Sequence, residues 1–203
     1  MKKVVFIISL ILVVMTTTVV MAAGVNGDYK GNPIINVVIN GVKLAFPDVP
    51  AIGYNGRTML PLRASVESVN GIVEWDNKTQ TATVIKPETS IFFFTIKDDG
   101  SMGETFSAIP ILESGEKFYS MLNIGGILKG TYTVKCEILN QSGTVVSYTG
   151  DMGVEIKEDY SMVEVPVIWD STELLPETYK FKVSMKDSAG VYKTIATKTM
   201  SYK

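Results

Sequence analysis

The sequence predicts a mainly β protein: an α+β first module, in which a small antiparallel sheet wraps on one helix, followed by an immunoglobulin-like β-sandwich. Two observations predict this class. Short β-prone runs alternate with turn signals along most of the chain, whereas an apolar stripe with helical spacing occurs at Leu62, Val66 and Val69. In addition, one strand–turn–strand pattern in the C-terminal half is repeated at a constant offset.

The chain begins like a secretory signal. Lysines precede an apolar run over residues 4–21, and the small residues Ala22 and Ala23 follow it. The alternative is a transmembrane anchor, but threonines interrupt the run. We therefore expect a signal peptide over 1–23 and a flexible leader over 24–32. The mature protein is expected to be secreted and extracellular, possibly cell-wall associated, with no stable membrane span after cleavage.

The composition excludes several classes of function. The net charge is −2, and loss of the two lysines of the signal makes the mature chain more acidic, which argues against a nucleic-acid partner. The chain has no histidine, so imidazole-based metal sites and Ser/His or Cys/His catalysis are not expected. We expect no cofactor and no metal. Cys136 alternates with apolar residues and is expected to be buried in a strand.

The first module, residues 33–86, reads as hairpins around one helix. Asn40–Gly41 and Asn55–Gly56 are two-residue hairpin turns. The strands expected from alternation are 35–39, 42–46, 51–54, 57–60, 72–75 and 81–85.

The helix is expected between Pro61, which fits a first turn, and Asn70–Gly71, which fits a left-handed stop. Its stripe together with Trp75 is expected to supply most of the module's core.

These residues resemble a known family. The runs 38–41, 56–63 and 73–76, which read Val-Ile-Asn-Gly, Gly-Arg-Thr-Met-Leu-Pro-Leu-Arg and Val-Glu-Trp-Asp, resemble the copper amine oxidase N-terminal-like (stalk) domain. The helix departs from the family's Ala/Phe-rich pattern. The resemblance implies a fold and a secreted bacterial setting, commonly Gram-positive. It does not imply oxidase activity, because the oxidase's catalytic part binds copper through histidines.

A hinge is expected at 87–90, and the second module spans 91–203. Its repeated pattern runs from Leu128 to Tyr148 and again from Leu175 to Lys198, which indicates either two related halves facing across a core or a duplicated unit. Leu-x-x-Thr-Tyr, at the start of each copy, resembles the tyrosine corner of immunoglobulin-like and fibronectin type III-like domains. Further strands are expected at 91–96, 117–124 and 162–169, with Trp169 packed inside.

The candidate binding residues are Tyr54, Arg57 and Trp75. Tyr54 and Trp75 would offer an aromatic platform, and Arg57 would grip an anion. The structural alternatives are that Trp75 packs inside and that Arg57 and Arg63 form charge pairs fastening helix to sheet.

Carboxylate pairs are the chemistry that needs no histidine. Asp98–Asp99 and Glu158–Asp159 both read as solvated turns. A carboxylate hydrolase would need two such groups converging across a cleft.

The function predicted is that of a secreted, non-catalytic binding or scaffold protein of the cell surface, with a cell-wall polymer or an extracellular protein as partner. The alternative is an inhibitor or regulator of an extracellular enzyme, such as a protease, acting through the loop 98–104 with Met102 at its middle.

Overall fold

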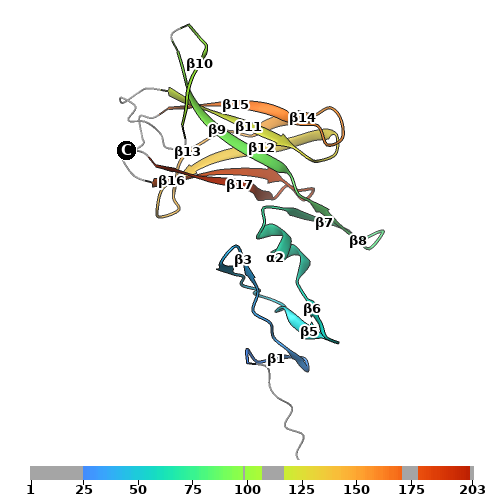
Figure 1. Ribbon diagram of the computed structural model, residues 1–203. Helices are drawn as coiled ribbons and strands as arrows, with labels where there is room; N and C mark the ends of the chain where they lie inside the picture. Colours follow the sequence, from blue (N-terminus) through green and yellow to red (C-terminus); the bar gives the residue numbers. More distant parts are fainter. Residues whose placement is uncertain (1–24, 98, 107–116, 171–177, 202–203) are drawn as a thin grey trace, which may run out of the picture. The chain divides into compact units, whose positions relative to one another are not determined.

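The structure is a computed structural model that describes residues 25–97, 99–106, 117–170 and 178–201. The predicted signal peptide over 1–23 lies outside the described residues. One α-helix and seventeen β-strands form in the described part of the chain, and they confirm the mainly β class (Figure 1). The chain divides into two compact units, Met1–Pro61 and Leu62–Lys203, each considered by itself.

Residues 25–61, the described part of the first unit, form three two-stranded hairpins. Their strands are β1 (Asp28–Tyr29), β2 (Asn32–Pro33), β3 (Val38–Ile39), β4 (Val42–Lys43), β5 (Ile52–Tyr54) and β6 (Arg57–Met59). The two predicted Asn-Gly turns are confirmed, because both residues of each turn have positive φ. Lys30–Gly31 forms a third turn of this kind, within residues expected to be a flexible leader.

The helix α2 spans Leu62–Glu67 and ends in a Schellman motif. The Gly71 N–H donates to the Val66 carbonyl at 2.9 Å, and the Asn70 N–H donates to the Glu67 carbonyl at 3.0 Å. Asn70 is the residue with positive φ, whereas Gly71 is required for space, since a Cβ there would lie 2.6 Å from Val66 Cγ1.

The prediction of which residues form the core of the first module is wrong. Leu62 on the helix and Val69 in the turn after it are exposed, and Trp75 is 49% exposed. The hairpin of β7 (Ile72–Asp76) and β8 (Thr81–Ile85) instead turns Ile72 into the core of the sandwich. Trp75 satisfies its indole N–H locally, by donating to Asn77 Oδ1 at 2.7 Å in the adjoining turn.

Two sheets form the sandwich, and their strand order is that of immunoglobulin-type domains. The four-stranded sheet has the order β10-β9-β11-β15, with strands β9 (Glu88–Ile96), β10 (Met102–Phe106), β11 (Lys117–Gly125) and β15 (Val163–Asp170). The other sheet has the order β13-β12-β16-β17, with β14 also pairing with β12. Its strands are β12 (Gly130–Leu139), β13 (Val145–Tyr148), β14 (Met152–Ile156), β16 (Thr178–Lys186) and β17 (Tyr192–Ser201).

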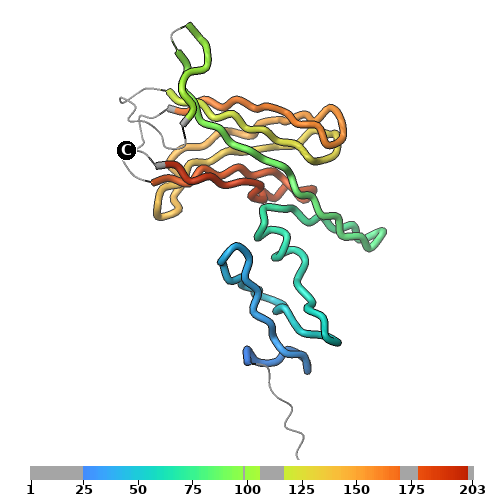
Figure 2. Tube along the Cα trace, viewed as in Figure 1, coloured from blue at the N-terminus to red at the C-terminus, as the bar shows by residue number. Residues whose placement is uncertain are grey.

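The chain enters the sandwich directly from the β7–β8 hairpin, as Figure 2 shows. The expected hinge residues 88–90 belong to β9, which pairs with β11 from Glu88 onward. The predicted strands at 91–96, 117–124 and 162–169 are confirmed, whereas β10 and β14 were not predicted.

Aromatic side chains from both sheets fill the core. Phe181 lies 5.2 Å, centroid to centroid, from both Phe93 and Trp169, in edge-to-face geometry. Trp169 is buried as predicted, and its indole N–H donates to Ser120 Oγ at 2.9 Å.

The repeated pattern forms two hairpins with the same turn. In each, the first turn residue accepts from the N–H four residues on, Asn140 from Thr144 at 2.9 Å and Asp187 from Val191 at 2.8 Å, both through side-chain Oδ1. The two hairpins lie side by side, with β12 paired to β16. The repeat is therefore a duplication within one sheet, and its halves do not face each other across the core.

Candidate binding groove

The predicted binding residues fall in different units. Tyr54 and Arg57 are cross-strand neighbours in the β5–β6 hairpin, and both are exposed. Trp75 lies on β7, in the other unit. The structure thus brings Tyr54 and Arg57 together, and a role in binding stays a prediction for all three residues.

Arg63 has the structural role that its sequence position indicated. Its Nη1 donates to the Val73 carbonyl at 2.9 Å and lies 4.0 Å from Glu67 Oε1. The side chain therefore fastens helix α2 to strand β7.

A groove that the sequence did not reveal lies between the β7–β8 hairpin and one end of the sandwich. Its volume is about 460 Å³, within the size range of ligand sites. We call it the hairpin groove. It is lined by Glu74, Thr83, Val84, Ile85, Lys86, Gly126, Ile127, Leu128, Lys129, Tyr132 and Tyr160.

Two glycines allow the sandwich side of the groove to form. A Cβ at Gly125 would lie 2.6 Å from the Ser161 carbonyl oxygen, and a Cβ at Gly126 would lie 2.8 Å from Glu88 Cγ. Gly126 also has a φ of +70°, which disfavours any residue with a side chain. The role of the paired glycines in the structure is close packing.

Tyr160, which lines the hairpin groove, has a strained backbone conformation. Its φ is +61°, a left-handed value that is rare for a bulky residue and costs about 1–2 kcal/mol. Its N–H donates to the Ile127 carbonyl at 2.7 Å, which holds the turn in place. The ring is 70% exposed, so burial of the ring does not offset this strain.

Tyr132 forms the predicted tyrosine-corner contact. Its hydroxyl donates to the Leu128 carbonyl at 2.8 Å, four residues upstream. Burial, together with the nearby carboxylates of Glu74 and Asp159, raises the pKa of Tyr132. This contact fixes the backbone of Leu128, whose side chain is exposed in the groove.

Backbone N–H groups engage the two carboxylates beside the groove. Glu74 Oε1 accepts from the Ser188 N–H at 3.1 Å, and Asp159 Oδ1 accepts from the Lys129 N–H at 2.8 Å. Lys86 and Lys129 also line the groove. Lys129 is shared with a neighbouring hollow of about 300 Å³, which Gly130, Thr131, Glu155, Ile156 and Lys157 complete.

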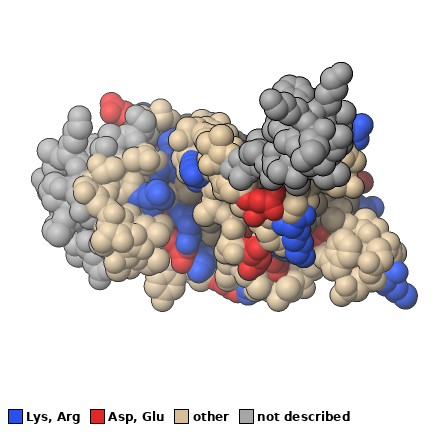
Figure 3. All heavy atoms as spheres, turned by 90° about the horizontal axis from the view of Figure 1, so that it is seen from below, with Lys and Arg blue, Asp and Glu red and all other residues tan. Residues whose placement is uncertain are grey.

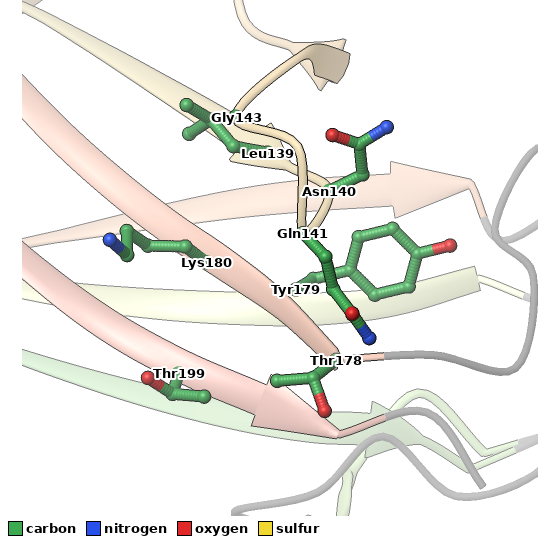
Figure 4. A pocket seen from close by; sticks show the side chains of 8 residues that line it. All are labelled: Leu139, Asn140, Gln141, Gly143, Thr178, Tyr179, Lys180 and Thr199. Atoms are coloured by element: carbon green, nitrogen blue, oxygen red, sulfur yellow. The ribbon is translucent and has the colours of Figure 1, made fainter.

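The opposite end of the sandwich has a separate hollow of about 300 Å³, shown in Figure 4. It lies where the turn after β12 meets the beginning of β16, and polar side chains such as Gln141, Lys180 and Thr199 surround it. The one aromatic residue in its lining, Tyr179, is buried. It therefore lacks the exposed aromatic ring that marks the hairpin groove.

The outer face of the five-stranded sheet carries a charge network. Glu137, 8% exposed, lies 2.8 Å from Lys135 Nζ and 2.5 Å from Lys182 Nζ. Burial acts to raise the pKa of Glu137, but the two lysines outweigh burial and leave this pKa below its ordinary value. On the face of the molecule seen in Figure 3, basic and acidic side chains likewise lie next to one another.

The predicted turn carboxylates are exposed where the structure describes them. Glu158 and Asp159 lie in the exposed turn that carries Tyr160, and Asp98 lies outside the described residues. The part of the chain that the structure describes contains no group of three or more Cys, Asp or Glu placed to hold a metal. Among those same residues, no helix is long and apolar enough to cross a membrane.

Two further predictions concern Cys136 and the loop 98–104. Cys136 is fully buried, and this burial raises the pKa of its thiol to about 12. Within the predicted loop 98–104, residues 99–101 lie in the connection between β9 and β10, and Met102, which is exposed, begins β10.

The fold defines an immunoglobulin-type sandwich preceded by small hairpins. Residues 38–101 match the family model of the copper amine oxidase N-terminal domain, which confirms the resemblance drawn from the sequence. The match runs from β3 into the turn after β9 and covers less than half of the chain. The matched family is the non-catalytic N-terminal domain of those oxidases.

Solved structures provide two further comparisons. An immunoglobulin-like protein from Pseudomonas aeruginosa is 13% identical, with a TM-score of 0.35, over 58% of this chain and 95% of its own. The soluble domain of PmoD from Methylocystis sp. is 15% identical, with a TM-score of 0.32, over 64% of this chain and 94% of its own. No curated protein matches the chain.

Proposed function

We propose that this chain is an exported, non-catalytic binding protein that is retained at the bacterial cell surface through the hairpin groove. The observation that carries the proposal is Tyr160, a groove residue whose ring is exposed and whose backbone is held in a left-handed conformation. Strained residues that the fold retains concentrate at functional sites, and exposed tyrosines are frequent binding anchors.

Export is inferred from the sequence. The basic start, apolar run and small-residue exit of residues 1–23 have the form of a cleavable signal. The resemblance to the stalk-type domain supports a bacterial envelope setting of the Gram-positive type. Intact-mass measurement of protein recovered from culture supernatant and cell walls is expected to show a chain that begins after Ala22 or Ala23.

The absence of catalysis is part of the same proposal. The chain has no histidine. Glu74, which lines the groove, and Asp159, next to Tyr160 in sequence, both accept backbone N–H groups. These carboxylates thereby have a structural use, which supports binding over hydrolysis as the role of the groove.

The test is co-sedimentation of the mature protein with an intact envelope fraction of a Gram-positive cell. Tyr160→Asn is expected to weaken retention about tenfold, since loss of an aromatic anchor has effects of this size. Asparagine tolerates the left-handed conformation, so stability should be unchanged or higher. Tyr148→Asn is the matched control, because Tyr148 is equally exposed and lies on β13. Equal retention of both variants and the parent would refute the role of the groove.

A further inference from the structure

We propose that Asn40 and Asn55 are sites of spontaneous covalent modification, at which the folded chain converts turn asparagines to aspartyl and isoaspartyl residues. A third asparagine in the same sequence setting, Asn70, is protected by the fold. Each of the three precedes a glycine and has a positive φ. The inference concerns these turns alone and is independent of the hairpin groove and of the proposed function.

An asparagine that is followed by glycine reacts without an enzyme. The backbone nitrogen of the glycine attacks Cγ of the asparagine side chain and closes a five-membered succinimide ring. The side-chain nitrogen leaves as ammonia, which carries away the proton that the backbone nitrogen gives up. Water then opens the ring at either carbonyl and gives aspartate or isoaspartate. Glycine favours the attack because it has no Cβ in the way of the approach.

The attacking nitrogens of the β3–β4 and β5–β6 turns are accessible. Gly41 and Gly56 are exposed, and nothing lies within 4 Å of a Cβ built at either position. Among the described residues, no backbone acceptor is paired with the N–H of either glycine. Asn40 and Asn55 are exposed as well. Neither packing nor hydrogen bonding therefore prevents the ring closure at these two turns.

Both hairpins also open at low cost, which the reaction requires because the asparagine must leave its turn geometry. Strands β3 and β4 share two residue pairs, and Val38 and Val42 of these strands are exposed. Strands β5 and β6 share three pairs, and Tyr54 and Met59 are exposed. Two-stranded hairpins with little buried surface are marginally stable and open locally.

Asn70 has the same neighbour but a different environment. Gly71 is buried, and its N–H donates to the Val66 carbonyl at 2.9 Å. The next residue, Ile72, belongs to the core of the sandwich. To free the Gly71 nitrogen, the chain must break the stop of helix α2 beside that core. We therefore expect the reaction at Asn70 to be slow in the folded chain.

A fourth Asn-Gly pair, Asn26–Gly27, is held through its side chain. Asn26 Nδ2 donates to the Ile34 carbonyl at 3.3 Å, and Asn26 Oδ1 accepts from Asn36 Nδ2 at 2.6 Å. Both ends of the amide that would turn toward the glycine nitrogen are thus engaged. For this reason the modification is assigned to Asn40 and Asn55.

The products change the hairpins in two ways. Isoaspartate adds one methylene to the main chain inside a two-residue turn, and the length of the turn sets the register of its strands. Each conversion also adds a negative charge to a chain that is already acidic. The β3–β4 and β5–β6 hairpins should therefore be lost in the isoaspartyl forms, while the sandwich keeps its core.

The test is incubation of the full mature chain at mildly alkaline pH, followed by tryptic digestion and mass spectrometry. Cleavage after lysine and arginine places the three asparagines in separate peptides, 31–43, 44–57 and 64–78. Asn40 and Asn55 are expected to gain the mass of the amide-to-acid change at least about tenfold faster than Asn70, because exposed turns open far more easily than segments beside a core. In denaturant the three rates should become similar.

The matched control is Asn40→Asp, which adds the charge without the methylene. Because Asp-Gly also suits this turn, amide exchange of residues 38–43 should stay as slow as in the parent, whereas the isolated isoaspartyl form should exchange faster. Equal rates at the three asparagines in the folded chain would overturn the inference. A difference that persists in denaturant would do so too, since it would come from neighbouring residues and not from the fold. Equally fast exchange in Asn40→Asp and in the isoaspartyl form would remove the methylene as the cause.

Discussion

The hairpin unit and the sandwich unit are each stabilised by a different kind of interaction. Among described residues 25–61 only Ala51 is buried, and the hairpins are specified by two-residue turns. In residues 62–203 a single core joins Ile72 of the β7–β8 hairpin to aromatic side chains of both sheets. The comparison shows that local turn chemistry suffices to predict the first unit, whereas the second depends on contacts between residues far apart in the chain.

The largest expected effect is the loss of a core aromatic ring. Phe181→Ala should lower the free energy of unfolding of the sandwich unit by about 3–5 kcal/mol, because it removes a fully buried ring that packs on Phe93 and Trp169. Urea unfolding followed by thiol labelling of Cys136 measures this, since that thiol is buried in the folded sandwich. Met59→Ala, at an exposed position in the hairpin unit, should change the same transition by less than about 0.5 kcal/mol.

A second effect tests the close approach at the end of helix α2. Gly71→Ala should cost about 1–3 kcal/mol, because the new Cβ would meet Val66 Cγ1 at 2.6 Å. Thermal unfolding by circular dichroism gives the comparison with Gly150→Ala, where nothing lies within 4 Å of the added Cβ. Equal melting temperatures for the two variants would contradict the packing described for α2.

A turn substitution in the hairpin unit should have a smaller and strictly local effect. Gly41 has a φ of +79°, so Gly41→Ala should destabilise the β3–β4 hairpin by about 1–2 kcal/mol. Amide exchange of residues 38–43 should become faster, while labelling of Cys136 stays unchanged. Faster labelling of Cys136 would show that the hairpins contribute to the stability of the sandwich.

The smallest effect concerns pH. The pKa of Glu137 lies below its ordinary value of 4.5, so the ionised carboxylate stabilises the fold above about pH 4.5. This contribution is lost as pH falls through the lower folded pKa, when the carboxylate takes up a proton. Glu137→Gln should reduce the loss of stability at low pH, measured as the fall of the urea midpoint between pH 7 and pH 3. An unchanged dependence of the urea midpoint on pH would mean that Lys135 and Lys182 do not stabilise the ionised Glu137 carboxylate.

The structural features that the sequence predicts correctly are those that depend on residues close together in the chain. The Asn-Gly turns, the helix stop at Asn70, the burial of Cys136 and Trp169, and the contact of Tyr132 with Leu128 all follow from local patterns. The exposure of Trp75 did not follow from the sequence. Alternation shows which residues share one face of a strand, but it does not show whether another element covers that face. The placement of both repeat hairpins in one sheet could not be predicted either, because no local sequence signal shows which strands pair when they are far apart in the chain.

The hairpin groove shows the same limit. Its parts come from separate segments, the β7–β8 hairpin, the Gly125–Gly126 turn and the turn that carries Tyr160. The one local signal was the double glycine, and it points to close packing without saying what packs there. The predicted residues Tyr54 and Arg57 were chosen for side-chain chemistry alone, in a hairpin whose hydrophobic residues are largely exposed.

Hydrogen–deuterium exchange of the full mature chain, free and with a solubilised envelope fraction, tests the central claim most directly. The account predicts new protection confined to the segments that form the hairpin groove, residues 81–86, 126–132 and 158–162. Protection confined to residues 52–59, around Tyr54 and Arg57, or no protection in any segment, would contradict it.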